Sequence, residues 1–268
     1  MRLPIYQVDA FSDHLFAGNP AAVCPLEQWL PDETMQAIAA ENNLAETAFF
    51  VPRGAGYELR WFTPACEVEL CGHATLATAY VIATHLQPGV SHLDFDSHSG
   101  LLQVEVDAAS GEIRMDFPAD APRPVAVPAK LSSILGVTIE ETAISRIGYL
   151  LATMSESAVH DASPDMQRLA ELGYSGVIVT ARGSDCDFVS RFFAPQLGVP
   201  EDPVTGSAHC VLTPYWAARL NKTVFDARQL SARGGQLRCE LRGERVLLAG
   251  RAVLYMQGWI EVPVIGVT

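Results

Sequence analysis

The sequence contains few charged residues, and basic residues are the scarcer kind. Lys and Arg number 18 against 31 Asp and Glu, so the 268-residue chain has a formal net charge of −13, and charged residues make up only 18% of it. A nucleic-acid-binding surface needs clustered Lys and Arg to neutralise phosphates. The composition therefore argues against nucleic acid as a partner, while the hydrophobic share of 49% is typical of a globular protein.

Long apolar runs and paired cysteine motifs are also lacking. No run approaches the ~20 residues of a membrane span, and the segment from Met1 to Asp9 has no apolar stretch of the signal-peptide type. None of the six cysteines forms a Cys-x-x-Cys pair, and Cys66 and Cys71 are separated by four residues. This spacing favours neither a zinc site nor a disulfide scaffold. We therefore expect a cytoplasmic protein with reduced thiols, no metal and no membrane association.

What the chain does contain is an internal repeat at about half its length. Three motifs recur in the same order, at offsets of 131, 134 and 135 residues: 60–64 (RWFTP) as 191–195 (RFFAP), 72–74 (GHA) as 206–208 (GSA), and 100–106 (GLLQVEV) as 235–241 (GQLRCEL). A repeat of this length is the size of a domain and not of a solenoid unit. It predicts two lobes of similar fold.

Each lobe is expected to hold strands in hairpins around one central helix, at residues 72–85 and 206–220. The first helix is apolar on almost every side, as a buried helix is, and Pro214 should kink the second. Strands in hairpins give an α+β fold: two pseudo-symmetric lobes, each a sheet rolled around a central apolar helix. The proline-rich residues 119–127 are predicted to link an N-terminal lobe, 1–118, to a C-terminal lobe, 128–268.

Shorter elements complete the prediction. A helix is expected at 31–41 with Met35, Ile38 and Ala39 on its apolar face, and others at 128–135 and 165–172. Residues 63–70 and 194–205 are expected to be loops that lead into the two central helices.

Both central helices begin with Gly-x-Ala after such a loop. The first turn of a helix has unpaired N–H groups and a partial positive charge, and glycine lets a ligand approach the backbone closely. If the lobes face each other, Gly72, His73, Gly206 and Ser207 would all border the cleft between them. A small carboxylate or enolate could then be held there without Lys or Arg.

Two acid–base candidates lie beside this expected cleft. His73 is the second residue of the first central helix, where the helix dipole disfavours its cation, so a neutral imidazole could relay a proton or polarise a carbonyl. Glu46 begins a strand whose same-face neighbours are Ala48 and Phe50. A carboxylate on that apolar face suits a general base near neutral pH, although an exposed carboxylate at a strand edge is the commoner situation.

Two further residues precede the helix starts. Asp202 lies just before the second central helix and could be a plain cap, or a second group that transfers a proton or orients the substrate. Cys71 is adjacent to Gly72, where a helix N-terminus lowers the pKa of a thiol. It is therefore a candidate thiolate base.

Six motifs resemble those of a known family: 7–11 (QVDAF), 18–23 (GNPAAV), 43–49 (NLAETAF), 60–64 (RWFTP), 70–76 (LCGHATL) and 201–209 (EDPVTGSAH). They resemble the PhzF-like phenazine-biosynthesis family, and most closely its branch of phenazine biosynthesis-like domain-containing proteins. The resemblance extends over almost the whole chain, and the last two motifs are specific.

The resemblance implies the diaminopimelate-epimerase fold, in which the last strand can cross back to the first lobe. It also implies an enzyme that isomerises a dihydro-hydroxyanthranilate by proton transfer, without cofactor or metal, and that commonly forms homodimers. The family's catalytic residues fall on Glu46, His73 and Asp202. Its substrate-holding backbone and hydroxyl groups fall on Gly72, Gly206 and Ser207, with Cys71 beside them.

The chain departs from the pattern of these families in two respects. Related epimerases and racemases use one cysteine in each lobe, whereas here only Cys71 has a counterpart, which disfavours a two-thiol mechanism. The Cys-Gly-His-Ala-Thr sequence belongs to the broader branch, so the substrate need not be the phenazine precursor.

We expect a cofactor-independent isomerase that moves a proton within a small carboxylate, with Glu46 as general acid and base. The substrate would be a dihydro-hydroxyanthranilate-like compound or another cyclic or amino-acid-derived carboxylate. The alternatives are an epimerase or racemase assisted by Cys71, and a protein of the same fold that binds without catalysis.

Overall fold

The computed structural model describes residues 1–263, and the chain divides into two compact units. Unit 1 comprises residues 1–115 and the chain from residue 250 onward, and unit 2 comprises residues 116–249. No helix in the described part of the chain is long and apolar enough to cross a membrane.

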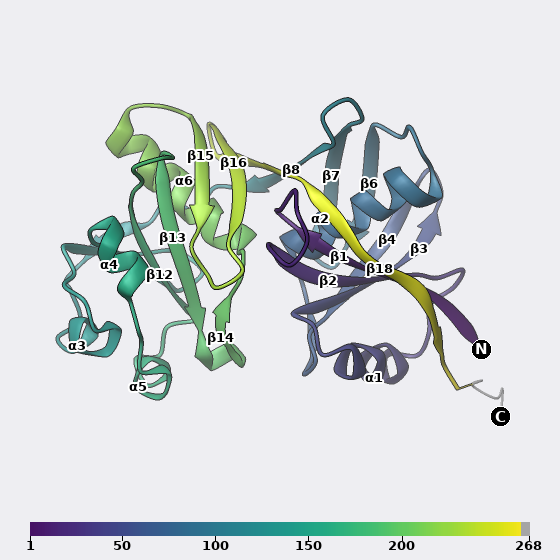
Figure 1. Cartoon of the computed structure of the whole chain (residues 1–268), viewed down its shortest axis with the longest axis horizontal. Coiled ribbons are helices and arrows are strands. Elements are labelled where there is room, and N and C mark those ends of the chain that lie inside the picture. Colours follow the sequence, from purple (N-terminus) through teal and green to yellow (C-terminus); the bar gives the residue numbers. More distant parts are fainter. Residues whose placement is uncertain (264–268) are drawn as a thin grey trace. The chain divides into compact units, whose positions relative to one another are not determined.

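Unit 1 is a mixed sheet with two helices (Figure 1). Its elements are β1 (Arg2–Ala10), β2 (Asn19–Pro25), α1 (Asp32–Asn42), β3 (Glu46–Arg53), β4 (Gly56–Phe62), β5 (Glu67–Val68), α2 (Gly72–Val81), the π-helical η1 (Ile82–Leu86), β6 (His92–Ser97), β7 (Gly100–Asp107), β8 (Glu112–Pro118, which runs across the boundary) and β18 (Ala252–Glu261). The strand order is β18-β1-β2-β3-β4-β6-β7-β8, with β2–β3 and β4–β6 parallel.

Unit 2 repeats this plan. Its elements are β9 (Arg123–Val125), α3 (Leu131–Leu135), β10 (Glu141–Ile144), β11 (Tyr149–Thr153), α4 (Glu156–Asp161), α5 (Met166–Ala170), β12 (Gly176–Arg182), β13 (Phe188–Ala194), the 3-10 turn η2 (Pro195–Leu197), β14 (Val199–Asp202), α6 (Gly206–Leu220), β15 (Val224–Gln229), β16 (Gly235–Arg242) and β17 (Arg245–Gly250). The strand order is β9-β10-β11-β12-β13-β15-β16-β17, with β11–β12 and β13–β15 parallel.

The two units therefore share one topology, strand for strand, which explains the repeat seen in the sequence. Each repeated arginine also makes the same bidentate ion pair. Arg60 Nε donates to Glu67 at 2.7 Å in unit 1, and Arg191 Nε donates to Glu201 at 2.7 Å in unit 2. A planar guanidinium matches a carboxylate in this way, so each pair holds the segment before a central helix against the neighbouring strand.

The central helices have the predicted character. In α2 the buried residues include His73, Leu76 and Val81, and the helix packs against β1, β2, β3, β7 and β18. The helix 72–85 is correct in extent, but its last turn is the π-helical η1. On the other side of the sheet, α1 buries its predicted face of Met35, Ile38 and Ala39.

Unit 2 departs from the predicted linker at residues 119–127. Residues 123–125 form β9, which pairs with β10. The N–H of Asp120 donates to the carbonyl of Cys210 at 3.0 Å, and Pro214, four residues later in α6, has no N–H to offer that carbonyl. The segment is thus built into unit 2, because it satisfies a backbone group that a proline inside the helix leaves open.

Other boundaries also differ from the prediction. The C-terminal lobe does not extend over the whole of 128–268, because the last strand, β18, pairs with β1 in unit 1, as the resemblance to the epimerase fold allowed. The expected loops 63–70 and 194–205 contain the short strands β5 and β14. Both strands pair with only a few residues of a neighbour. Strands this short have no hydrophobic pattern in the sequence that would predict them.

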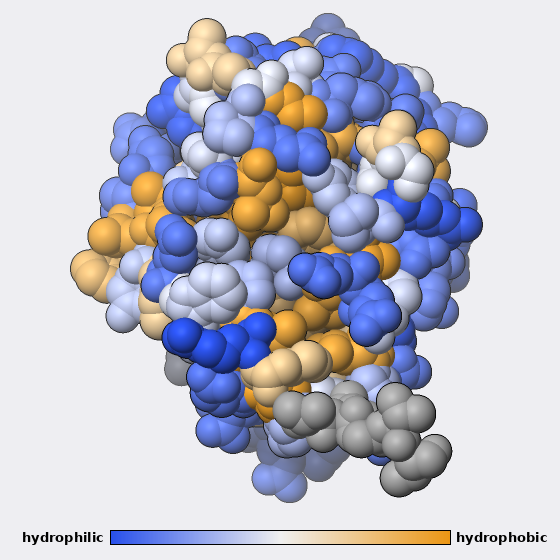
Figure 2. Space-filling model, turned by 90° about the vertical axis from the view of Figure 1, so that its right-hand side faces the viewer, coloured by the Kyte–Doolittle hydropathy of each residue, from blue (hydrophilic) through white to orange (hydrophobic). Residues whose placement is uncertain are grey.

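Some apolar side chains stay exposed. Figure 2 shows apolar residues lying among hydrophilic ones on one face of the molecule. In unit 1 the side chains of Phe16 and Trp259 are 70% and 61% exposed, and the ring of Phe16 meets Tyr255 edge-on at 5.9 Å. Exposed apolar groups of this kind suit contact with another protein surface. The homodimer itself stays a prediction.

Candidate active site

Glu46 is the first residue of β3, and the five residues after it are buried. It lies opposite Ala21 in the parallel pair of β2 and β3. Its side chain is only 18% exposed, so it is not a solvent-exposed carboxylate at a strand edge. The apolar strand therefore carries a single carboxylate, at the end where the sheet meets the start of α2.

The side chain of Glu46 contacts the imidazole ring of His73. Nε2 of His73 lies 3.0 Å from Oε2 of Glu46, and the imidazole is only 6% exposed. This contact is short but not aligned as a hydrogen bond, and both atoms are buried. In the absence of substrate, catalytic contacts are often poorly aligned. The structure thus brings together Glu46 and His73, the two acid–base candidates that sequence analysis placed beside the same expected cleft.

The other ring nitrogen of His73 has two neighbours. Nδ1 lies 3.2 Å from Nδ2 of Asn19 and 3.5 Å from Sγ of Cys71. Cys71 is the residue that caps α2, and its side chain makes no capping hydrogen bond. Asn19 was not predicted as a site residue, although the Gly-Asn-Pro turn that contains it was one of the motifs that carried the resemblance.

The electrostatics differ from the sequence expectation at two residues. Burial, followed by the nearby Glu46 carboxylate, raises the pKa of Cys71 to about 11. Burial acts to lower the pKa of His73, but Cys71 and Glu46 outweigh it and raise that pKa well above the ordinary value. The expected low thiol pKa is therefore wrong, and the pKa of His73 shifts in the direction opposite to that expected from the helix dipole, because neighbouring groups and burial outweigh the dipole.

Histidine, cysteine, aspartate and glutamate side chains are potential metal ligands. Within residues 1–263, one set of three has ligand atoms that all lie within 4.8 Å of one another: Glu46, Cys71 and His73. However, the sulfur approaches Nδ1 and the carboxylate approaches Nε2, on opposite sides of the ring. A metal ion binds one nitrogen of an imidazole and needs its other ligands on that same side. The arrangement suits a proton relay better than a metal centre.

In unit 2 the predicted residues lie together at the start of α6. Asp202 ends β14, and its Oδ2 accepts a hydrogen bond of 2.5 Å from the hydroxyl of Thr205, the residue that caps α6. Ser207 Oγ lies 3.1 Å from the hydroxyl of Tyr149. Burial raises the pKa of Tyr149, so the phenol keeps its proton and can donate to Ser207.

A buried glutamine, Gln229, fixes this segment. Its Nε2 donates to the backbone oxygen of Asp202 at 2.7 Å and to Thr205 Oγ1 at 3.1 Å, and its Oε1 accepts from the N–H of Thr205 at 2.9 Å. Gln229 is 1% exposed. Neither Gln229 nor Tyr149 was predicted, since no local pattern marks a side chain whose partners lie 24 or more residues away.

The repeat also shows what unit 2 lacks. Thr47 pairs with Phe62, and Val177 pairs with Phe193, so Gly176 stands where unit 1 has Glu46. A Cβ atom at Gly176 would lie 2.4 Å from the ring of Phe192. The residue that caps α6 is Thr205, where α2 has Cys71. Unit 2 therefore has neither the carboxylate nor the thiol of unit 1 at these positions.

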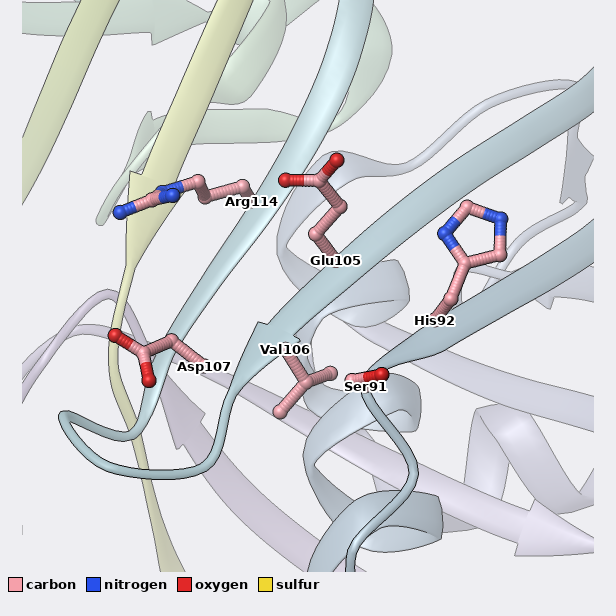
Figure 3. Close-up of a pocket in the computed structure, with 6 residues that line it drawn as sticks. All are labelled: Ser91, His92, Glu105, Val106, Asp107 and Arg114. Carbon is pink, nitrogen blue, oxygen red and sulfur yellow. The ribbon is translucent and has the colours of Figure 1, made fainter.

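A pocket of about 360 Å³ in unit 1 contains none of the predicted site residues. Figure 3 shows its side chains projecting from β6, β7 and β8, with Glu105 beside Arg114. Glu105 lies opposite both His92 and Arg114 in the strand register, and all three are exposed. These are cross-strand pairs on an open surface, so we assign the pocket no function.

Comparison with known proteins places the chain in one family. The family model PhzC-PhzF, phenazine biosynthesis-like protein, matches residues 8–258. Two proteins of Pseudomonas aeruginosa, each named an uncharacterized isomerase, are 52% identical over 262 and 263 residues, which is 98% of this chain and 100% of each relative. The phenazine biosynthesis-like domain-containing protein 1 of Mus musculus is 38% identical over 291 residues, covering 96% of this chain and 99% of the relative.

Comparison with solved structures supports the same family. A phenazine biosynthesis protein of the PhzF family from Enterococcus faecalis has a TM-score of 0.94 at 46% identity, covering 98% of this chain and 100% of that chain. A hydroxyproline epimerase from Agrobacterium vitis has a TM-score of 0.65 at 10% identity, covering 97% and 92%. That second likeness shows the fold alone, and it confirms the α+β, epimerase-like architecture. The chain belongs to the PhzC-PhzF family of phenazine biosynthesis-like proteins.

Proposed function

We propose that this protein is a cofactor-independent isomerase in which Glu46 moves a proton within a small carboxylate substrate. The observation that carries the proposal is the buried contact of 3.0 Å between Glu46 Oε2 and His73 Nε2 at the start of α2. Two relatives at 52% identity carry the name isomerase, which supports a reaction rather than binding alone.

The chemistry needs one base that also acts as the acid. Glu46 takes a proton from a carbon next to an unsaturated system, the double bonds shift, and Glu46 returns the proton to another carbon of the same molecule. No electrons leave the substrate, so no oxidant is required. A single base agrees with Gly176 at the corresponding position of unit 2.

The remaining predicted residues would bind and orient the substrate. His73 orients Glu46, and the N–H groups at the start of α2 stabilise the delocalised negative charge. We assign Asp202 to orientation of the substrate, and the backbone and hydroxyl groups of Gly206 and Ser207 to its carboxylate. General acid–base catalysis supplies roughly 10²–10⁴-fold, so preorganised dipoles must supply the rest. A dihydro-hydroxyanthranilate-like or other cyclic or amino-acid-derived carboxylate fits this description.

Incorporation of deuterium from solvent into a panel of cyclic and amino-acid-derived carboxylates tests the proposal. We expect the wild type to exchange at least one of them, and Glu46→Gln to lose about 10²-fold or more of the rate because the amide cannot accept the proton. The matched control is Glu41→Gln, an exposed carboxylate in α1, which should exchange like the wild type.

Two results would contradict the proposal. Equal exchange by the wild type and Glu46→Gln would remove Glu46 from the mechanism. Failure of the wild type to exchange any compound of the panel would favour a protein of this fold that binds without catalysis.

A Cys71-assisted epimerase is the second candidate, because Sγ of Cys71 lies 3.5 Å from Nδ1 of His73. Two observations weigh against it: the pKa of Cys71 is raised to about 11 by burial, and Thr205 occupies the corresponding position before α6.

The variant Cys71→Ser separates the two mechanisms, because a serine hydroxyl keeps the size of the thiol but is a far weaker base. If Glu46 is the base, the deuterium-exchange rate of Cys71→Ser stays within about threefold of the wild type, since the altered group donates only one weak hydrogen bond. A loss as large as that of Glu46→Gln would establish the cysteine mechanism instead.

A further inference from the structure

Two hydrogen-bond donors face Nδ1 of His73. They are Nδ2 of Asn19, at 3.2 Å, and Sγ of Cys71, at 3.5 Å. A side-chain amide nitrogen can only donate. Because burial raises the pKa of Cys71 to about 11, its sulfur keeps a proton at neutral pH and can donate as well. An Nδ1 atom placed between two donors is favoured as an acceptor.

The opposite ring nitrogen faces an acceptor. Nε2 of His73 lies 3.0 Å from Oε2 of Glu46, and a carboxylate oxygen only accepts hydrogen bonds. Both atoms are buried, and neither makes an aligned hydrogen bond within the described chain. The two sides of the imidazole therefore differ in kind, with donors at Nδ1 and an acceptor at Nε2.

The backbone holds Asn19 in place. Asn19 is fully buried and lies opposite Ala10 in the pairing of β1 with β2. Gly18 precedes it with φ +68°, and a Cβ atom there would lie 2.2 Å from the carbonyl oxygen of Ala10. Only glycine allows this turn. The amide of Asn19 is thus presented by a fixed turn and the first residue of a strand, not by a mobile loop.

We propose that Asn19 is a positioning residue that keeps the proton of the neutral His73 ring on Nε2, where it faces Glu46. The inference rests on the proposed role of Glu46. Nothing in the resemblance or in the comparisons assigns Asn19 this role.

The consequence concerns where the substrate proton can go. A ring with its proton on Nε2 presents that proton towards Glu46 and cannot accept a proton from Glu46 at that nitrogen. Glu46 is therefore left protonated after it takes a proton from one carbon, and it remains the acid that protonates another carbon of the substrate. With the opposite tautomer, Nε2 would be an acceptor and could draw the proton away from Glu46, which would leave Glu46 without the proton it must deliver to the second carbon.

NMR of protein labelled with ¹⁵N in its histidine rings tests the tautomer directly, without any substrate. The His73 signals are identified by their loss in His73→Gln. Spectra are recorded from neutral to alkaline pH, because the raised pKa of His73 delays the loss of its second proton. In the wild type we expect Nδ1 to lose its proton and Nε2 to keep it.

Asn19→Asp should reverse this pattern, because a carboxylate of the same shape accepts from Nδ1 and cannot donate to it. The matched control is Asn42→Asp, whose amide donates to Thr47 at 3.1 Å in the same unit; it should leave the His73 signals unchanged. Cys71→Ala should also keep the proton on Nε2, since Asn19 remains.

Three outcomes would overturn the proposal: a wild-type ring with its proton on Nδ1, an unchanged tautomer in Asn19→Asp, or a reversed tautomer in Cys71→Ala. The tautomer of the wild-type ring is measured without any variant, so the proposal can be contradicted even if Asn19→Asp folds poorly. Because the spectra require no turnover, a failure of the Glu46 mechanism would appear in the exchange assay and not here.

Discussion

His209 shows at the residue scale how burial controls ionisation. It lies one turn inside α6, is fully buried, and its Nδ1 donates to the backbone oxygen of Thr205 at 2.8 Å. Burial lowers its pKa to about 4, against the weaker opposing effect of that hydrogen bond. His73 is also buried, but its pKa is raised because Cys71 and the Glu46 carboxylate beside it outweigh the lowering effect of burial. The neighbour, not the residue type, sets the direction.

The first prediction concerns stability against pH. His209 has a lower pKa in the folded state than in the unfolded state. As the pH falls from about 6.5 towards 4, the unfolded state therefore binds a proton that the folded state does not, and the free energy of unfolding decreases. Between pH 7 and pH 5 we expect this residue to remove about 2 kcal/mol from the free energy of unfolding.

Urea unfolding at the two pH values measures this effect. His209→Gln should lack that part of the pH dependence, whatever its stability at neutral pH, whereas His160→Gln, an exposed histidine, should keep it. The same slope in His209→Gln and wild type would show that His209 titrates normally.

At the element scale, α6 depends on a segment far from it in sequence. Pro214 interrupts the hydrogen bonds of α6, because it has no N–H to donate to the carbonyl of Cys210. The N–H of Asp120 donates to that carbonyl instead. The carboxylate of Asp120 in turn accepts from the N–H groups of Arg146 and Ile147, at 3.0 and 3.2 Å. One aspartate thus ties together the helix, the first strands of unit 2 and their connecting turn.

The second prediction is that Asp120→Ala lowers the free energy of unfolding by about 2 kcal/mol, because it removes a buried carboxylate that accepts hydrogen bonds from two backbone N–H groups. Asp120→Asn keeps an acceptor oxygen and should lose less. Denaturant unfolding measures both, with Asp185→Ala, an exposed aspartate of unit 2, as the control that should stay within about 0.5 kcal/mol. A loss for Asp120→Ala no larger than that of the control would assign the segment to a loose linker.

At the scale of the whole molecule, the chain enters unit 1 twice. β18 pairs with β1 from Arg2 opposite Glu261 to Ala10 opposite Ala252, so the first and last strands complete one sheet. The chain returns at Gly250, where a Cβ atom would lie 2.5 Å from the ring of Phe11 and 3.4 Å from Leu76 of α2. The return of the chain therefore passes directly over the central helix that carries His73.

The third prediction tests that close passage. Gly250→Val should overpack the region and destabilise unit 1 by about 1–3 kcal/mol, whereas Gly258→Val, at a position with open space around it, should be tolerated. Hydrogen–deuterium exchange should report faster exchange in β1 and α2 for Gly250→Val only. Unchanged protection of both elements would mean that Phe11 moves aside freely.

The sequence by itself determined the elements whose cause is local. The repeat, the two central helices, the apolar face of α1 and the placement of Glu46 and His73 near a helix start all follow from periodicity, glycine positions and motif order. The same local cues failed for β5, β9 and β14, because such short strands exist only through pairing with residues distant in the chain.

Only the tertiary structure decided how the site residues behave. Asn19 reaches His73 across 54 residues of sequence, and Gln229 reaches Thr205 across 24. Burial and Glu46 raise the pKa of Cys71, and Cys71 and Glu46 raise the pKa of His73 against the effect of burial, opposite to the directions that their sequence positions suggested. Electrostatic energy depends on distance and dielectric environment, and the fold creates both.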